Sequence, residues 1–494
     1  MTMTSRSFHA LVLAAALGGC SKSDGTEGKD PATKASTADT DTADQADKAG
    51  KAKPTDGDKK PGVRKARKAG DDTADTADTQ VAPKPAKVDE KATRPGPAYI
   101  GVEGSGLVRV DGAKVKTIIP YDYPFYDLVI DPRNGTLYAS AISALWEVKG
   151  DVVSKLPQPD DIHNVEKLAL GPDGVLWGLG HGGVARRDGK GWTREPAKTF
   201  EDALLSDIAV DRGGRVWVVT TSFIWRLDGD KWKRIDNKLA RDQPFWKTVI
   251  AGPAGEVYLS GNAGTFVYEG DAWRKLTLST GILQPDELAV GPDGRLAASG
   301  GLADVSLAAP GTAAKGLDLK SSAIKAKQLD VMAVDGAGRT WIRSDNGVVI
   351  LDGDGALLQQ WRPGTVAGIN GKVQAIAVAG AGPELPELKA AAKGAIAGKV
   401  IHNGKAVAGA VIEICASPGM MFRTSPCGDA IVSHRATSAA DGTFTIPDVA
   451  VGSYGFAIKP RAKWLVFLGG GGCCEKLENG QTYDVGAITL ERLE

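Results

Sequence analysis

This sequence of 494 residues has no excess of positive or negative charge, few long helical patterns and no familiar catalytic motif. Basic and acidic residues are equal in number, at 60 each, so the formal net charge is zero. A chain with balanced charge lacks the basic excess of a nucleic-acid binder or of a strongly cationic membrane-surface protein. We therefore expect no nucleic acid among the partners.

Catalytic signatures are also missing. No G-x-S-x-G, H-E-x-x-H or P-loop pattern occurs, and only two of the five histidines, His163 and His181, fall in the central part of the chain. His181 stands in a glycine turn, GLGHGGV, without a visible set of further histidine or carboxylate ligands. We therefore assign no catalytic residue, no metal ligand and no cofactor from the sequence.

Extended apolar helical patterns are absent outside the first residues; only 386–394, PELKAAAKG, has the composition of a short helix. The 63 glycines instead favour a β-rich, turn-dense protein. Residues 205–235 show this best, because four short apolar segments, at 206–210, 215–220, 223–227 and 232–235, are separated by turn residues. The dipeptides Gly213-Gly214 and Asp228-Gly229 supply the positive φ angles of tight hairpins. This segment predicts a four-stranded antiparallel meander.

The same unit repeats along the chain with a period near 40 residues. The glycine of its first turn recurs at Gly135, Gly174, Gly214, Gly255, Gly294 and Gly338. Four strands per 40 residues is typical of propeller blades, and a tryptophan in the fourth strand recurs at Trp192, Trp232 and Trp273. The fifth unit, with Ala297-Ala298 and no tryptophan, departs most from the pattern.

The ends of the array indicate how the ring closes. Residues 373–382 look like the first strand of a further unit, and 98–118 look like its remaining three strands. Six whole units and one shared between the ends predict a seven-bladed β-propeller over 98–382 with no open sheet edge. The pattern I-x-x-D-x-x-G-x-x-W resembles the propeller repeats of periplasmic sensor regions of two-component regulators and, more loosely, NHL repeats. The resemblance implies a fold and no particular activity.

The first 19 residues look like an export signal. Arg6 precedes an apolar run too short to span a bilayer, and the run ends at Leu17-Gly18-Gly19-Cys20. This resembles a bacterial lipoprotein signal, which implies that Cys20 is lipidated after cleavage; an ordinary secretory signal is the alternative. Ser21 and Lys22 follow, without an early Asp, which favours an outer-membrane lipoprotein facing the periplasm or the exterior.

Residues 20–97 are expected to form a disordered linker behind the lipidated cysteine. From Ser21 to Pro97 the only large aliphatic residues are Val63, Val81 and Val88, which cannot offset the entropy of ordering the chain. Calcium binding by its aspartates and cell-wall binding by its basic block are alternatives to a solvated spacer.

The C-terminal part, 394–494, follows a connector at 383–393 and has period-2 strands with glycine turns. It resembles the carboxypeptidase regulatory-like domain, a small Ig/transthyretin-like β-sandwich, which implies a non-catalytic module. The matching residues are Gly398, Val400, Gly404, Val407, Gly409, Ala410, Thr437, Asp441, Gly442, Phe444, Ile446, Gly452 and Tyr454.

Four cysteines remain besides Cys20, namely Cys415, Cys427, Cys473 and Cys474. An even number in an exported chain predicts two disulfides. We expect each member of the adjacent pair to bond one of the other two cysteines, because a bond between neighbouring residues strains their peptide; a tetrathiolate metal site is the alternative.

Aromatic residues before two predicted first strands are the candidate ligand contacts, namely Tyr121, Tyr123, Phe125, Tyr126, Phe245 and Trp246. Large aromatic side chains in loops on one face of a propeller suit protein or ligand contact, although they could instead cap the blade cores. The sequence therefore indicates a non-catalytic, envelope-anchored lipoprotein whose propeller binds a protein or carbohydrate ligand or acts as a scaffold. A propeller hydrolase or lyase acting at the channel mouth is the alternative.

Overall fold

The computed structural model is an all-β protein in the residues that it describes. These are 90–120, 124–160, 162, 164–189, 191–201, 204–235, 245–278, 284–300, 304–319, 324, 326, 328–344, 347–415, 418–419, 424–428, 433–452, 454, 455–467, 473–474 and 477–493. The signal, Cys20 and nearly all of the predicted linker lie outside them. Within this part of the chain the structure has no α-helix, only the 3-10 helices η1 (Glu90–Thr93) and η2 (Ala197–Phe200).

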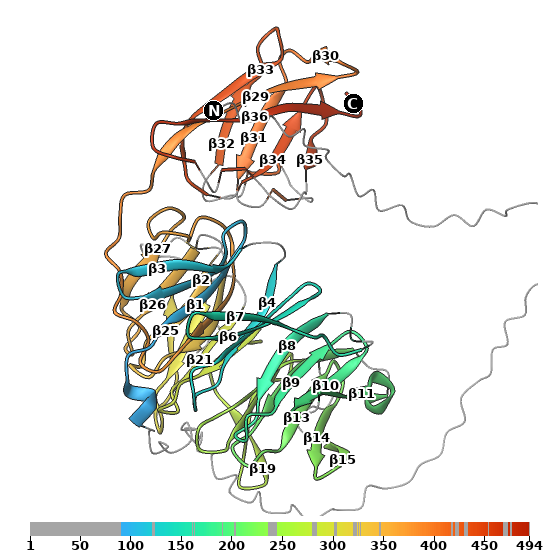
Figure 1. Ribbon diagram of the computed structural model, residues 1–494, viewed down its shortest axis with the longest axis vertical. Helices are drawn as coiled ribbons and strands as arrows, with labels where there is room; N and C mark the ends of the chain where they lie inside the picture. Colours follow the sequence, from blue (N-terminus) through green and yellow to red (C-terminus); the bar gives the residue numbers. More distant parts are fainter. Residues whose placement is uncertain are drawn as a thin grey trace, which may run out of the picture. The chain divides into compact units, whose positions relative to one another are not determined.

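Seven four-stranded antiparallel sheets form the propeller, which confirms the predicted number of blades (Figure 1). Six have their strands in chain order. These are β4–β7 (Phe125–Ile130, Leu137–Ala141, Ala144–Lys149, Val152–Leu156), β8–β11 (Val165–Leu170, Leu176–Gly180, Gly183–Asp188, Gly191–Pro196), β12–β15 (Leu205–Val210, Val216–Thr220, Ile224–Asp228, Lys231–Ile235), β16–β19 (Trp246–Ala251, Val257–Gly261, Gly264–Glu269, Ala272–Leu276), β20–β23 (Glu287–Val290, Leu296–Gly300, Asp304–Ala308, Lys315–Asp318) and β24–β27 (Leu329–Val334, Thr340–Ser344, Gly347–Leu351, Leu357–Trp361). The fifth repeat, weakest in sequence, thus forms a complete blade.

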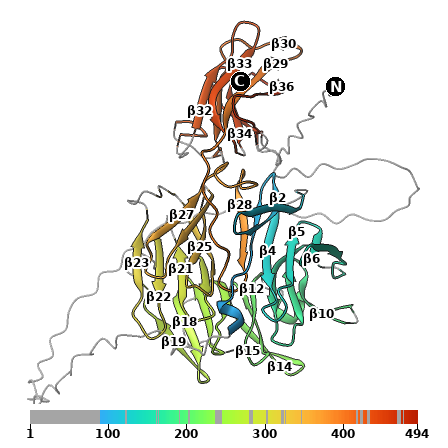
Figure 2. The same ribbon diagram turned by 60° about the vertical axis from the view of Figure 1, so that its left-hand side comes forward.

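The seventh sheet joins the two ends of the propeller segment. Its order is β28-β1-β2-β3, with β28 at Val373–Val378, β1 at Ala98–Val102, β2 at Gly106–Asp111 and β3 at Lys114–Ile119. Tyr99 pairs with Ala377 across the junction, and Figure 2 shows β28 in orange beside the blue N-terminal strands. The first strands of neighbouring blades contact one another in the order β4, β8, β12, β16, β20, β24, β28 and back to β4. The shared sheet therefore closes the ring.

The repeated glycines lie in tight turns, as the sequence predicts. Gly135, Gly174, Gly214, Gly255, Gly294 and Gly338 all have φ between 75° and 96°, a range that side chains other than glycine adopt at a cost. In three blades a buried aspartate, Asp131, Asp211 or Asp335, completes this turn. Asp335 accepts hydrogen bonds from the backbone N–H groups of Ala337 (3.0 Å) and Arg339 (2.9 Å), from Arg339 Nε (2.7 Å) and from Trp341 Nε1 (2.8 Å). Asp211, Arg215 and Trp217 repeat this arrangement.

The apolar cores lie between adjacent blades rather than within one blade. One core combines Trp217 and Ile224 of β12–β15 with Trp246 and Phe266 of the next blade. Because each sheet buries both faces against its neighbours, no blade is complete without the two beside it.

The C-terminal part is a sandwich of two four-stranded sheets. One contains β30 (Lys405–Ala406), β29 (Lys393–His402), β33 (Thr443–Ala450) and β36 (Thr482–Leu490), with β36 parallel to β29. The other has the order β32-β31-β34-β35 (Ser433–Thr437, Val411–Cys415, Gly455–Lys459, Leu465–Phe467). Val400, Ile412, Phe444, Ile446 and Ile458 are buried between them. The short helix expected at 386–394 is wrong: 383–392 is irregular and β29 begins at Lys393, because so short a segment has little helical stability of its own.

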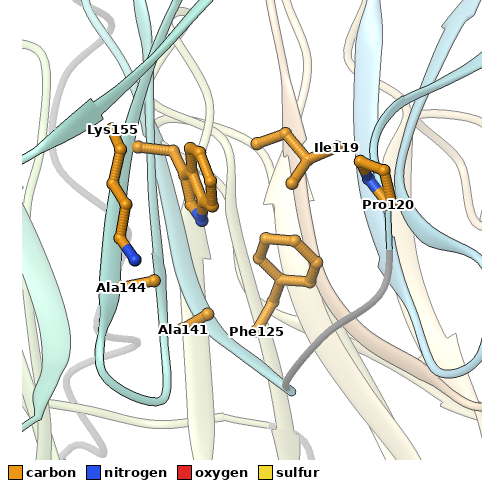
Figure 3. Close-up of a pocket in the computed structure, with 7 residues that line it drawn as sticks. Ile119, Pro120, Phe125, Ala141, Ala144 and Lys155 are labelled. Carbon is orange, nitrogen blue, oxygen red and sulfur yellow. The ribbon is translucent and has the colours of Figure 1, made fainter.

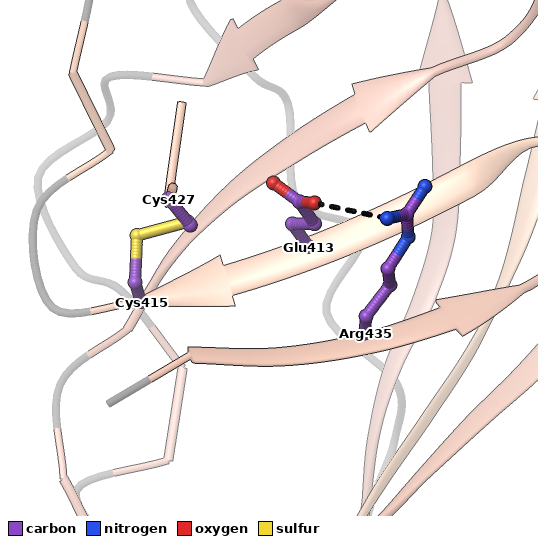
Figure 4. The surroundings of a disulfide bond; sticks show 4 residues. All are labelled: Glu413, Cys415, Cys427 and Arg435. Atoms are coloured by element: carbon purple, nitrogen blue, oxygen red, sulfur yellow. Dashed lines mark ion pairs between the residues drawn. A yellow bond between two sulfur atoms is a disulfide. The ribbon is translucent and has the colours of Figure 1, made fainter. Parts of the chain in front are cut away.

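All four described cysteines form disulfides, but the expected pairing between loops is wrong. Cys415 bonds Cys427, with Cα atoms 5.8 Å apart, and Cys473 bonds its neighbour Cys474 (Figure 4 shows the first). Cys415 is fixed at the end of β31, and the intervening loop returns Cys427 to it. Cys473 is held elsewhere, in a bridge with Tyr454, so that the adjacent Cys474 becomes its partner. With every thiol in a disulfide, the tetrathiolate alternative does not fit.

Candidate functional site

The innermost strands of four successive blades start with the same irregularity. The pairing register shifts between residues 125 and 127, 165 and 167, 205 and 207, and 246 and 248. Each shift leaves one residue without a partner across the sheet: Tyr126, Glu166, Ser206 and Lys247. Such β-bulges re-aim the side chains around them and are common beside functional sites.

A polar residue follows each bulge, and the rest of the strand after it is apolar. These residues are Asp127, Lys167, Asp207 and Thr248, and Glu287 holds the equivalent place at the start of β20. Their spacings in the sequence are 40, 40, 41 and 39 residues, so they occupy one position of the repeat. Since the strands that carry them form a ring, these five side chains lie at one level around the propeller axis.

Two of the carboxylates join neighbouring blades and are thereby held in place. Asp127 Oδ2 accepts a hydrogen bond from the backbone N–H of Leu168 on the next inner strand, at 2.8 Å. Asp207 Oδ2 likewise accepts from Thr248 Oγ1 at 2.9 Å and from the N–H of Val249 at 3.0 Å. Charge-assisted hydrogen bonds of this kind are stronger than neutral ones, so these carboxylates are preorganised.

The blade formed by β24–β27 contributes its charge from the second strand. Arg343 donates from Nε and Nη2 to Asp330 Oδ2, at 3.0 and 2.7 Å, and from Nη1 to the carbonyl of Gln374 at 2.6 Å. Gln374 Oε1 in turn accepts from the N–H of Phe125 at 2.9 Å, which joins the closing sheet to the first whole blade. Arg343 is therefore a satisfied cation at the same level of the ring.

We call Asp127, Lys167, Asp207, Glu287 and Arg343 the axial cluster. Their charges act on one another: Asp207 is the main cause that raises the pKa of Lys167, and Glu287 and Asp127 add to it. Burial raises the pKa of Glu287 to about 7, against the opposing effect of Lys167. Lys167 and Glu287 stand on β8 and β20, on opposite sides of the ring, and each charge still affects the pKa of the other.

Burial also raises the pKa of Asp127 to about 6, although Lys167 and two backbone N–H groups favour its ionised form. The two carboxyl groups thus titrate near neutral pH. Lys167 and Glu287 are partly exposed, and within the described part of the chain neither makes a direct hydrogen bond or ion pair. Perturbed ionisable groups without direct partners, gathered at one place, are typical of functional sites.

A small apolar pocket lies at the same end of β4. It has a volume of about 70 Å³ and is lined by Ile119, Pro120, Phe125, Ala141, Ala144, Trp146 and Lys155 (Figure 3). Phe125 reaches this place because the neighbouring strand has Gly101, where a Cβ atom would come within 2.9 Å of the phenyl side chain. Lys155 lies over the ring of Trp146 at 5.7 Å. The pocket has room for a single small side chain.

The aromatic residues singled out from the sequence do not form one surface. Trp246 is fully buried and packs edge-on against Phe266, with ring centroids 5.8 Å apart. Phe125 is also buried, whereas Tyr126 is partly exposed and Phe245 is 49% exposed. Tyr121 and Tyr123 lie outside the described residues. Phe125 and Trp246 therefore match the alternative expectation, in which these residues fill the blade cores.

His181 does not join the axial cluster. Its Nε2 lies 3.3 Å from Glu166 Oε1, and its side chain is 71% exposed. Among the described residues no three His, Cys, Asp or Glu side chains are placed to hold a metal ion. The cluster itself was missed from the sequence, although the polar residue recurring in one register of five successive repeats was a readable signal.

Fold and site together define a seven-bladed propeller with a charged axis, followed by a disulfide-containing sandwich. No protein-family model matches the chain, and no curated protein matches it. Solved structures with a similar arrangement include virginiamycin B lyase from Staphylococcus aureus, at 12% identity over 67% of this chain and 96% of the lyase, with a TM-score of 0.42.

Two further similar structures have other roles. The extracellular domain of a putative hybrid two-component system from B. thetaiotaomicron matches at 16% identity, over 56% of this chain and 38% of that chain, with a TM-score of 0.41. The WD40 repeats of RRP9 match at 10% identity over 69% of this chain and 100% of that one, with a TM-score of 0.43. At these identities and TM-scores the likenesses assign no function, and the propeller rests on its own strands.

Proposed function

We propose that the protein is a non-catalytic lipoprotein of the bacterial cell envelope whose propeller binds a protein or carbohydrate ligand. The binding site is the end of the ring where the inner strands begin. The axial cluster is the observation that carries this proposal, because it gathers fixed charges whose partners among the described residues are incomplete. Exposed Phe245 and Leu204 precede inner strands at the same end, and the backbone of Thr221 bonds to Leu204 and Trp246 between them.

The proposal is tested with the mature chain from residue 21 onward, screened against arrays of glycans and of peptides. A double variant, Asp127→Asn with Glu287→Gln, should lose the binding that the unmodified chain shows. The matched control, Asp151→Asn with Glu195→Gln, removes two carboxylates from the outer part of two blades, at the turn between β6 and β7 and on β11, and should bind normally. Binding that survives the axial variant, or no binding on either array, contradicts the proposal.

Envelope anchoring rests on the Leu17-Gly18-Gly19-Cys20 motif. No helix in the described part of the chain is long and apolar enough to cross a membrane. Metabolic labelling with palmitate should mark the protein in the membrane fraction, and Cys20→Ala should abolish both the label and the membrane association. A variant that stays labelled and membrane-bound would show that the anchor lies elsewhere.

A hydrolase or lyase remains the second candidate, and one observation favours it. The carboxyl groups of Glu287 and Asp127, with pKa values of about 7 and about 6, can exchange protons near neutral pH, as a general acid or base must. The two candidates differ in the fate of the ligand. Once a ligand is found, its recovery unchanged after prolonged incubation supports binding, whereas a cleaved ligand supports the enzyme.

A further inference from the structure

The axial cluster has fewer available cations than carboxylates. Arg343 is engaged by Asp330 and by the carbonyl of Gln374. Lys167 is then the remaining cation for Asp127, Asp207 and Glu287. Asp207 is buried, but its negative charge is compensated by hydrogen bonds from Thr248, Val249 and its own neighbour Ile208. The deficit of positive charge therefore falls on Asp127 and Glu287.

Of these two, Glu287 has the weaker support. Asp127 accepts hydrogen bonds from the backbone N–H groups of Leu128 and Leu168, both at 2.8 Å. Glu287 receives no direct hydrogen bond within the described part of the chain, although it opens the inner strand β20 at the repeat position that Asp127 and Lys167 occupy in their blades. A buried charge without a full set of partners is costly, and a ligand that supplies the missing charge recovers that cost.

We propose that the axial cluster binds an organic cation, an ammonium or guanidinium group, with Glu287 as its principal counter-charge and Asp127 as the second. This inference rests on the proposed function, because it names the chemistry of the ligand at that same site. The cation is borne either by a free amine or by a basic side chain of a peptide. An inorganic dication fits less well, since no three carboxylates among the described residues converge as metal ligands.

An anionic ligand is disfavoured by the same geometry. Lys167 is the cation that an anion would have to use, and Asp207, Glu287 and Asp127 already act on it. An arriving anion would meet their field before it reached the ammonium group. Lys167 therefore competes with a bound cation, which makes its removal a test of opposite sign from the removal of Glu287.

Proton release should accompany binding. At about pH 5 Glu287 and Asp127 are mostly protonated and offer little charge to a cation, whereas at about pH 8 both are ionised. Each carboxyl group must lose its proton before it offers a negative charge to the cation. Affinity for a cation should thus rise by at least about tenfold between these pH values. A probe whose charge is constant over this range isolates the titration of the protein.

The experiment is a calorimetric titration of the mature chain with two probes, 1,4-diaminobutane for a free amine and an arginine-containing tripeptide with blocked ends for a side chain. We expect one or both to bind at about pH 8 and to weaken by about tenfold at about pH 5. Glu287→Gln should weaken binding at about pH 8 by about tenfold and remove most of the pH dependence. The control Glu195→Gln should change neither.

Lys167→Met provides the second arm, because a structural defect cannot imitate its expected effect. Removing the competing ammonium should strengthen binding of both probes by several-fold. The inference is overturned if neither probe binds at about pH 8, if Ca²⁺ displaces both, if Glu287→Gln binds normally, or if Lys167→Met weakens binding. A neutral or anionic ligand lost from the double axial variant would overturn this inference and leave the proposed function standing.

Discussion

The propeller and the sandwich are closed by different means. The propeller segment, 98–382, contains no cysteine, and its ends are joined by the ladder between β1 and β28 and by side chains such as Asp127 that reach the next blade. The sandwich is smaller and contains all four described cysteines, with Cys415–Cys427 fixing the end of β31. A ring whose two ends share one sheet gains its closure from topology, whereas a small sandwich gains stability from covalent links.

The two parts also differ in what they bury. The propeller places charged groups at its axis, where Lys167 and Glu287 make no direct hydrogen bond or ion pair with any described residue. In the sandwich, Glu413 is buried beside Arg435, whose Nη1 lies 3.8 Å from it, on an otherwise apolar core (Figure 4). This contrast is the reason that the proposed ligand site lies in the propeller.

The largest expected effect comes from breaking the closure of the ring. Deleting 98–118 removes five fully buried side chains of the shared blade, Ile100, Val102, Leu107, Val108 and Val110. At about 2 kcal/mol for each, the loss approaches the whole stability of a typical domain. Tryptophan fluorescence reports this, because every tryptophan except Trp464 lies in the propeller. The deletion should abolish the cooperative thermal transition, while the sandwich disulfides stay oxidised.

Deleting 21–89 is the matched control for that prediction. Those residues carry little apolar surface, so we expect the thermal transition to be unchanged. A cooperative, unshifted transition after loss of 98–118 would instead mean that six blades close the ring without the N-terminal strands.

A somewhat smaller effect is expected from the buried aspartate in the turn of one blade. Asp335→Ala removes the buried carboxylate that accepts from Arg339 Nε and from the indole N–H of Trp341, which should lower the unfolding free energy of the propeller by about 4 kcal/mol. Asp293→Ala, in the blade that has Gly291 at the equivalent place, removes a partly exposed carboxylate and should cost about 1 kcal/mol. Urea unfolding measures both; equal losses would show that the aspartate has no special role.

Loss of the Cys415–Cys427 bond should affect the sandwich alone. The bond closes a loop with a sequence separation of 12, which constrains the unfolded chain by about 3 kcal/mol. The double variant Cys415→Ala with Cys427→Ala should therefore unfold the sandwich earlier, seen as earlier proteolysis after β31, while the fluorescence transition of the propeller tryptophans stays at its original temperature and only the signal of Trp464 shifts. Thiol counting on the denatured, unreduced mature chain without Cys20 should find none; four free thiols would contradict both disulfides.

The smallest effect concerns the dependence of stability on pH. Because the pKa of Glu287 is raised to about 7 in the folded protein, the native state retains a proton that the unfolded chain has released. Stability should therefore fall as pH rises from about 4.5 to about 7, and Glu287→Gln should remove about 1–2 kcal/mol of this fall. Urea midpoints across this range measure it, and a slope identical to that of the unmodified chain would contradict the burial of Glu287.

Much of the propeller could be predicted because its signals are local and repeated. Gly214 and its equivalents mark turns that need positive φ, and the match between 98–118 and the strands of a whole repeat indicates closure. Residues 386–394 were wrongly predicted as a helix because their composition favours one, whereas so short a segment has little helical stability of its own. Its backbone instead bonds to the propeller, with Lys389 N–H donating to the carbonyl of Thr365. The disulfide pairing could not be predicted, because it depends on where β31 and Tyr454 hold their cysteines.

The axial cluster shows a different limit. Asp127 and Lys167 each look like an ordinary polar residue near the start of a strand, and only the alignment of repeats puts them at one level. Even then, the pKa of Glu287 is raised by burial and changed by charged residues of other blades, so it cannot be inferred from one repeat alone. Trp246 was predicted to lie in an exposed loop and to contact a ligand. It is instead the first residue of β16 and is fully buried.

The most direct test of the axial site is the pKa of Glu287, measured by carboxyl-carbon NMR on mature protein with labelled glutamate, with and without Lys167→Met. We predict a pKa of about 7 in the unmodified chain. It should be higher in the variant, because Lys167 favours the ionised carboxylate across the ring. A pKa near the ordinary value of 4.5 that does not respond to Lys167→Met would contradict a shared axial cluster.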